Sequence, residues 1–292
     1  MSDQEHKKTC PCLALRRVLA GPPEAVAEER YLLAAGASAL LCLAYGATVL
    51  GPRLLWLALL AALSGLAVEL VFARVRRKPL TGGAVVHGLL LALLLPVALP
   101  WWMAVLGAVF GTVFAKEVFG GAKNCVFNPV LAAAGFVVYS YPTIFSGASF
   151  AHLSPLADPA NAWQIGALLC LGCALLMVVV RPSALWIYLG IAIGAYGIAR
   201  YAIPETALPF DGDLRLLFTA NGFMTIGCLL SVDPAGAPQR WYNRLFFGLI
   251  IGVAAVTMRC FSLYENAMLS ALLLANIFAP TLDLLFVGRA KA

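Results

Sequence analysis

Ten apolar runs, separated by short polar stretches, are the feature that most constrains how this chain can fold. An α-helix needs about 20 apolar residues to cross the hydrocarbon core of a bilayer. Because lipid offers the backbone no hydrogen-bond partners, such runs must form helices, and none alternates as a transmembrane strand does. We therefore expect an all-α integral membrane protein with about ten transmembrane helices. The runs cover residues 31–50, 54–73, 83–99, 101–118, 129–145, 162–180, 183–200, 214–231, 244–261 and 266–286.

Composition and charge support the same fold class. Hydrophobic residues make up 62% of the sequence and charged residues 12%, and a mean hydropathy of +0.90 excludes an ordinary soluble domain. The net charge of +6 comes from short basic clusters between the apolar runs, so we interpret it as a topology signal. Lipid is the expected surrounding, and no nucleic-acid partner is expected.

The distribution of Lys and Arg predicts the side of the membrane on which each loop lies. With a cytoplasmic N-terminus, sixteen of the 20 basic residues fall in cytoplasmic segments. The exceptions are Arg53, Arg200, Arg215 and Arg259. Since basic residues resist translocation, we expect a multi-pass protein of the inner (cytoplasmic) membrane with both termini cytoplasmic. The segment 1–30 and the tail 287–292 are then cytoplasmic, and the loops 146–161 and 201–213 face outward.

The chain also repeats itself. Three segments recur in the same order at shifts of 138, 139 and 141 residues. They are 128–133 with 266–271, 83–90 with 222–229, and the glycine pair Gly107 and Gly111 with Gly248 and Gly252. Because each half holds five spans, an odd number, the halves must enter the membrane from opposite sides. We predict two inverted transmembrane repeats, 31–161 and 162–286.

Proline and glycine interrupt the third and eighth runs at corresponding places, 95–101 and 231–238. Non-helical backbone is tolerated at membrane depth only where protein or a cavity surrounds it. We expect these broken helices to meet near the midplane and a prosthetic group or substrate to lie there. Asp233 is the most informative intramembrane acid, and three roles are open: to hold a cation, to orient a flavin, or to cap a helix.

Residues 116–129 form the stretch richest in polar and glycine residues. Gly120 and Gly121 permit a close backbone turn, while Asn124 and Asn128 offer amide donors and acceptors to a bound group. Asn128 followed by Pro129 is also typical of a helix start, with Asn as the N-cap. A cofactor site and a re-entrant turn with a helix cap are both open interpretations.

Most of the eight cysteines lie inside the predicted helices. Free cysteine is among the most buried residue types, so we interpret these thiols as small core residues. They are Cys42, Cys170, Cys173, Cys228 and Cys260. The pair Cys10 and Cys12 has no second pair to complete a four-cysteine metal site, and we predict no metal site.

Four dispersed motifs resemble one known family. The first two are Phe119-Gly120-Gly121 with Asn124 and Phe127-Asn128-Pro129, and Thr81-Gly82-Gly83 at the start of the third run. The others are Asp233-Pro234 with Ala237-Pro238, and Asn276-Ile277-Phe278-Ala279-Pro280. In this order they resemble the family of the Rnf complex D subunit and the sodium-pumping Nqr B subunit. The resemblance extends over roughly residues 30 to 286.

The resemblance implies a flavin-carrying membrane subunit with one FMN joined by a phosphoester to a hydroxyl in an outer S-G-A-T motif. The corresponding residues here are Ser146, Gly147, Ala148 and Ser149, with Ser149 as the attachment candidate. The chain departs from the family pattern in having Ser149 in place of Thr and Thr143 in place of Asp. FMN at Ser149, a flavin held without a covalent bond, and no flavin are all open, as is a second flavin.

Our leading hypothesis is an electron-transfer subunit of an Rnf-like complex that couples ferredoxin and NAD chemistry to ion transport. The predicted cofactor-binding residues are Ser146, Gly147, Ala148, Ser149, Gly120, Gly121, Asn124, Asn128 and Asp233. Other membrane and peripheral subunits and a flavin transferase are the implied partners, and we predict no catalytic residue in this chain alone. The alternatives are a channel or secondary transporter of inverted-repeat type without a redox cofactor, and a scaffold that has lost its cofactors.

Overall fold

The described part of the chain is predominantly helical, and it contains no strand. The computed structural model describes residues 24–77, 80–121, 125, 127–145, 162–203, 223–234, 236–261 and 267–285. Five of its helices are long and apolar enough to cross a membrane. They are Glu29–Leu50, Arg53–Arg76, Ala184–Tyr201, Trp241–Phe261 and Ala267–Leu284. The all-α, multi-pass membrane fold predicted from the apolar runs is thereby confirmed.

The helices coincide with the predicted spans, except that the eighth span is described only from Phe223 onward. The first group is α2 (Glu24–Leu50), α3 (Arg53–Arg76), α4 (Gly83–Leu94), α5 (Trp101–Phe110), the π-helix η2 (Gly111–Glu117), α6 (Pro129–Ser140) and α7 (Pro142–Phe145). The second is α8 (Ala162–Val180), α9 (Ala184–Tyr201), α11 (Phe223–Leu229), α12 (Trp241–Phe261) and α13 (Ala267–Leu285).

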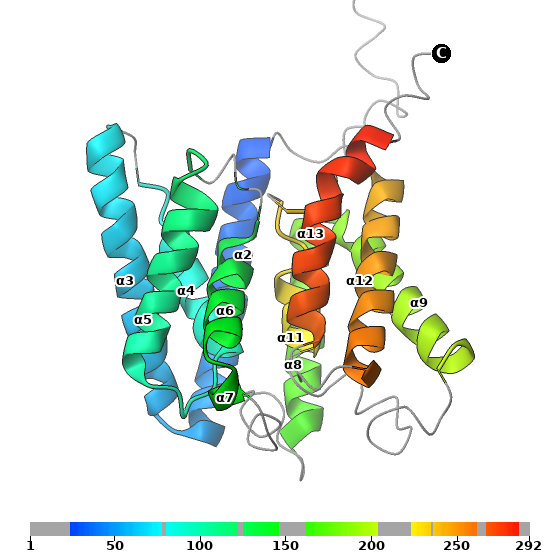
Figure 1. Ribbon diagram of the computed structural model, residues 1–292, viewed down its shortest axis with the longest axis horizontal. Helices are drawn as coiled ribbons and strands as arrows, with labels where there is room; N and C mark the ends of the chain where they lie inside the picture. Colours follow the sequence, from blue (N-terminus) through cyan, green and yellow to red (C-terminus); the bar gives the residue numbers. More distant parts are fainter. Residues whose placement is uncertain are drawn as a thin grey trace, which may run out of the picture.

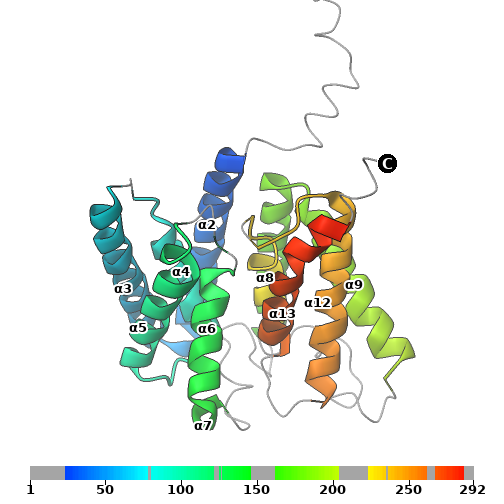
Figure 2. The ribbon, with the colours of Figure 1, turned by 45° about the horizontal axis from the view of Figure 1, so that its top comes forward.

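The two groups lie side by side and share one apolar core (Figures 1 and 2). Within the first group, α3 packs on α4 and α5, α2 packs on α4, and α6 packs on α4 and α5. Within the second group, α9 packs on α11 and α12, α8 packs on α11, and α13 packs on α11 and α12. Between the groups, α2 contacts α8 and α6 contacts α13.

The two predicted breaks are present, but they lie toward opposite ends of the bundle. The first break follows α4, whose cap Leu95 is extended, and its Ala98 and Leu99 carbonyls each accept a hydrogen bond from Arg53 at the start of α3. The second follows α11 and contacts the start of α6. With 12 residues, α4 is only about 18 Å long. The start of α3 lies at the lower end of the bundle in Figure 1, and the start of α6 lies toward the upper end. The breaks therefore do not meet as expected.

Glycines on two helices make the closest helix crossing, between α9 and α12. A Cβ at Gly194 would stand 2.6 Å from the Leu249 carbonyl oxygen, and one at Gly248 would overlap the Ile187 carbonyl oxygen. By contrast, Gly107 and its partner Gly111 face α6. The matched glycine pairs of the two halves thus serve close packing against different neighbours.

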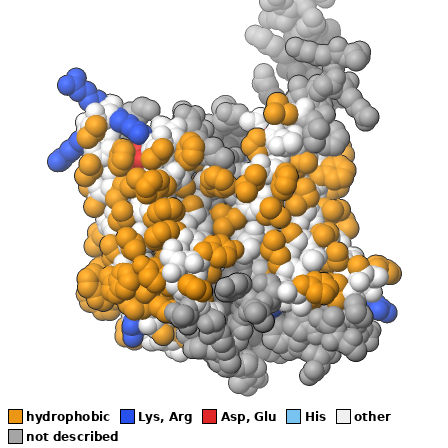
Figure 3. Space-filling view, viewed as in Figure 1, with side chains coloured by type: hydrophobic (Ala, Val, Ile, Leu, Met, Phe, Trp, Pro, Cys, Tyr) orange, Lys and Arg blue, Asp and Glu red, His pale blue; other side chains and the backbone are white. Residues whose placement is uncertain are grey.

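Apolar side chains cover the face of the molecule in Figure 3, and basic side chains lie toward its ends. Trp101 and Trp102 begin α5 and are well exposed, as is Trp56 in the first turn of α3, while Trp241 is exposed at the start of α12. Tryptophans at helix ends are typical of the two interfaces of a bilayer.

Candidate functional site

The break after α11 brings together two predicted site residues that are 105 positions apart. The Asn128 side-chain amide donates to Asp233 Oδ2 at 2.8 Å, and both residues are buried. The Asn128 Oδ1 accepts from the Val130 backbone N–H, also at 2.8 Å, so Asn128 is the N-cap of α6. The predicted cap is present, and its amide also tethers the broken segment to α6.

Side-chain donors from α2, from α9 and from the segment between α8 and α9 reach carbonyls at the end of α11 and in the break that follows it. Tyr188 donates its hydroxyl to the Cys228 carbonyl at 2.6 Å, and Tyr31 of α2 donates to the Leu229 carbonyl at 3.1 Å. Arg181, between α8 and α9, donates to the Val232 carbonyl at 2.5 Å. The final carbonyls of a helix lack intrahelical partners, and each costs several kcal/mol if left unpaired in an apolar medium. These donors allow the helix to stop inside the bundle.

Arg181 also supplies a counter-charge to Asp233. Burial lowers the pKa of the Arg181 guanidinium, and the nearby Asp233 carboxylate acts in the opposite direction. A buried carboxylate is tolerated when a cation and a hydrogen-bond donor accompany it. Arg181 is thus a nearby positive charge, and Asn128 a direct hydrogen-bond donor, to the buried Asp233 carboxylate. These side chains can hold the backbone of the break after α11 in place and set the electrostatic field there.

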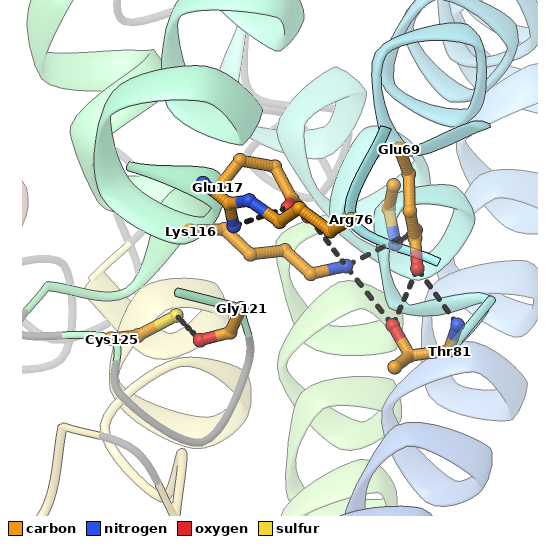
Figure 4. A network of polar contacts seen from close by, with 8 residues as sticks. Glu69, Arg76, Thr81, Lys116, Glu117, Gly121 and Cys125 are labelled. Atoms are coloured by element: carbon orange, nitrogen blue, oxygen red, sulfur yellow. Dashed lines mark hydrogen bonds and ion pairs between the residues drawn. The ribbon is translucent and has the colours of Figure 1, made fainter. Parts of the chain in front are cut away.

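A second buried polar cluster lies where α3, α4 and η2 meet (Figure 4). The Lys116 ammonium is 3.1 Å from Glu69 Oε2 and donates to Thr81 Oγ1 at 3.1 Å. Glu69 accepts from the backbone N–H groups of Thr81 at 2.9 Å and Ala84 at 3.1 Å, at the N-terminus of α4. Lys116 and Glu69 are 1% and 3% exposed, so this ion pair is enclosed by protein.

An outer ion pair extends this cluster. Arg76, the last residue of α3, lies 3.3 Å from Glu117 Oε2, and Glu117 Oε1 lies 4.0 Å from the Lys116 ammonium. The sequence analysis did not single out this pair. The missed signal was that both residues lie near the C-terminal ends of the second and fourth spans, which run in the same direction, so that their charges can pair.

Gly120 and Gly121 end the helix that carries Lys116. Their φ angles are 104° and 107°, a region that favours glycine. The Gly121 N–H donates to the Lys116 carbonyl and the Gly120 N–H to the Glu117 carbonyl, each at 3.0 Å. Cys125 donates weakly to the Gly121 carbonyl at 3.6 Å. The close turn predicted for this glycine pair is confirmed.

The predicted cofactor residues are divided between the two ends of α6. Asn128 begins this helix, which is about 18 Å long, and the described chain continues through α7 to Phe145. The predicted residues that come next, Ser146, Gly147, Ala148 and Ser149, lie outside the described residues, as does Asn124. Within the described part, no three His, Cys, Asp or Glu side chains form a group that could hold a metal ion.

Exchanging charge across the pair of Asn128 and Asp233 tests the tether. We expect Asn128→Asp to lower the thermal midpoint of the solubilised protein more than Asn128→Ser does. Both replacements keep a capping oxygen, but only the first places a second carboxylate against Asp233. Losing the charged hydrogen bond alone costs about 1.5–3 kcal/mol. The swap Asn128→Asp with Asp233→Asn restores a donor–acceptor pair and should recover stability; equal midpoints for the two single variants would contradict the pairing.

Comparison with known protein families gives a match over most of the chain. A sequence profile of the NQR2, RnfD, RnfE family matches residues 27–291. The chain belongs to this family. The resemblance inferred from four short motifs is thus confirmed, and the match covers both helical groups of this NQR2, RnfD, RnfE family member.

Three individual relatives are the same subunit of the same enzyme in different bacteria. The B subunit of the Na(+)-translocating NADH-quinone reductase of Klebsiella pneumoniae is 29% identical over 262 residues, which cover 75% of this chain and 63% of the relative. Its Haemophilus influenzae counterpart is 28% identical over 258 residues, covering 75% and 63%. The Neisseria meningitidis counterpart is 28% identical over 262 residues, covering 76% and 64%. The chain thus spans less than two thirds of the length of these relatives.

Proposed function

We propose that this protein is a membrane-embedded electron-transfer subunit of an ion-translocating, Rnf-like redox complex, and that it carries FMN. The observation that carries the proposal is the family match over residues 27–291, together with relatives that are B subunits of a Na(+)-translocating NADH-quinone reductase. The chain works beside other membrane and peripheral subunits, which handle the soluble substrates. It is not catalytic alone.

We propose, as part of this function, that segments 31–161 and 162–286 are inverted repeats. The packing supports this because the pairs α3–α5, α4–α6, α5–α6 and α2–α4 recur as α9–α12, α11–α13, α12–α13 and α8–α11. The contacts between the groups are also of the kind a two-fold axis creates. Such an axis brings an element against its own equivalent, and here α2 contacts α8 while α6 contacts α13.

We place the termini on the cytoplasmic side of the inner membrane. The described helices carry Arg74, Arg76 and Arg77 to the end of the bundle where α2 begins and α13 ends. Arg53 and Arg200 lie at the opposite end. A cluster of basic residues on one side favours that side as cytoplasmic. In this orientation α7 ends on the outer side, directly before the segment that carries Ser149.

Two features of the described residues bear on the proposed flavin site. Both polar atoms of the Asn128 side chain are engaged, leaving one N–H to offer. A Cβ built at Gly121 would meet no atom within 4 Å, so this turn borders open space that a planar group can approach. Bound FMN would supply the electron-transfer chemistry. The chain's own share is to exclude water, hold the broken helix rigid and fix the charges of Asp233 and Arg181.

Attachment at Ser149 rests on the motif and can be tested by substitution. The protein is expressed with its flavin transferase and its neighbouring subunits, then resolved on a denaturing gel and viewed for flavin fluorescence. We expect a fluorescent band for the unaltered chain and for Ser149→Thr, which restores the family's residue. Ser149→Ala should abolish the band, while Ser146→Ala should keep it. A band that persists in Ser149→Ala overturns this attachment.

An inverted-repeat transporter without a cofactor is the second candidate, and the observation in its favour is the buried Asp233 at a broken helix. Intramembrane acids mark ion pathways in that class. The nearby Arg181 and Asn128 argue against a simple cation site, because a positive charge and a hydrogen-bond donor already lie near the carboxylate. Flavin bound to this chain in the native preparation decides for the redox subunit, and the absence of flavin from this chain decides for the transporter.

A further inference from the structure

Two thiols face each other across the junction of the two helical groups. Cys42 of α2 and Cys173 of α8 have their sulfur atoms 3.9 Å apart. Their exposed fractions are 0% and 3%, and both are free cysteines. Sequence reasoning could not find this pairing, since 131 residues separate the two positions. The contact joins α2 to α8, the helices through which the two groups meet.

The surroundings of this pair are closed to water and sparse in hydrogen bonds. Ser38, one turn before Cys42 on α2, is 0% exposed, and its hydroxyl has no hydrogen-bond partner among the described residues. The sulfur of Cys170, one turn before Cys173, contacts the Thr225 hydroxyl of α11 at 3.8 Å. No three described thiols form a metal-binding group. Cys42 and Cys173 are therefore placed to react with each other as a pair of thiols.

The distance is short enough for a bond after a small movement. A disulfide has a sulfur–sulfur length of about 2.05 Å, so the two atoms need to approach by about 1.9 Å. Side-chain rotation and a slight shift of one helix can provide this. Water-soluble disulfides cannot reach sulfurs buried this deeply, because exchange requires access to the attacking thiolate. Any oxidant reaches these sulfurs only when α2 and α8 part locally. Leu41 and Leu171, next to the two thiols in sequence, are exposed on the apolar surface, so an apolar oxidant can approach from the lipid.

We propose that Cys42 and Cys173 form a redox-active dithiol that a quinone dissolved in the membrane oxidises to a disulfide linking α2 to α8. Both S–H bonds break and one S–S bond forms. The two electrons and two protons pass to the quinone, which becomes a hydroquinone. The resulting bond ties the two helical groups together in the oxidised state. The proposal does not depend on the flavin proposed at Ser149.

The test uses the full chain with its neighbouring subunits in native membranes, carrying Cys10→Ser and Cys12→Ser so that the N-terminal pair cannot respond. Duroquinone serves as the oxidant, because its ring is fully substituted and cannot add a thiol. After acid quenching, the intact mass and the alkylation of each cysteine are measured. We expect the loss of two hydrogen atoms and protection of Cys42 and Cys173 from alkylation.

Matched variants make the result specific. Cys42→Ala or Cys173→Ala should abolish the mass loss, whereas Cys260→Ala, on α12, should keep it. The proposal is overturned if both thiols remain open to alkylation after duroquinone, or if the mass loss persists in Cys42→Ala and Cys173→Ala.

Discussion

Replacing Lys116 by Met is expected to destabilise the folded protein by about 3–5 kcal/mol, the usual cost of leaving one member of a buried ion pair alone. Lys116 is 1% exposed and lies 3.1 Å from Glu69 Oε2, so no water can take the place of the ammonium. Thr81 would still bond the carboxylate, but it brings no charge. The thermal midpoint of the solubilised protein and the yield of monodisperse material measure the loss.

A second variant separates lost charge from lost packing. Combining Lys116→Met with Glu69→Gln removes both charges, and it should recover a large part of the stability lost in Lys116→Met. The recovery is incomplete, because the amide no longer accepts equally well from both the Thr81 and Ala84 backbone N–H groups. A single variant as stable as the unaltered protein would show that Glu69 is solvated, contrary to the structure.

Replacing Gly248 by Ala is expected to separate α9 from α12. The added Cβ would overlap the Ile187 carbonyl oxygen and stand 3.0 Å from the Gly190 Cα, and backbone atoms cannot rotate away. Membrane helices associate through close packing of small residues because no hydrophobic force acts between them in lipid. Overpacking costs about 1–3 kcal/mol and occasionally more. Heating followed by size-exclusion chromatography measures the fraction that remains folded.

Gly197→Ala, on α9 itself, is the matched control. A Cβ at this position meets no atom within 4 Å, and alanine has the higher helix propensity, so stability should stay equal or rise. The difference in stability between the two variants separates the effect of the close α9–α12 crossing from the general effect of replacing a helical glycine. Equal stabilities would mean that α9 and α12 do not cross as closely as the structure has them.

The spans could be predicted because their signals are local. A run of apolar residues long enough to cross lipid has only the helical solution, and proline at Pro96 and Pro234 marks the breaks. Asn128 as an N-cap also follows from its own sequence neighbours. Even the family was predictable from four short motifs, since the profile match covers residues 27–291.

The contacts that complete the candidate site depend on how the helices pack against one another, and this packing could not be predicted from the sequence. Tyr31 donates to a carbonyl at the end of α11 and Arg181 to one in the break after it, although each donor lies far from its acceptor in sequence. Lys116 finds Glu69 only because η2 packs on α3. The expectation that the two breaks meet was wrong for a related reason. Their correspondence in sequence indicates that the two halves are equivalent, but it does not indicate that equivalent points lie close together in space.

A flavin held by this membrane protein within a redox complex is the property on which its proposed function depends. The most direct measurement is the visible spectrum of the complex, purified from its native membranes with its natural neighbours, recorded before reduction, after reduction and after reoxidation, and normalised to this chain. We predict a flavin band that bleaches on reduction, returns on reoxidation and, after denaturation, remains in part with this chain. A preparation whose flavin is absent, or resides entirely on other subunits, would contradict the proposed function.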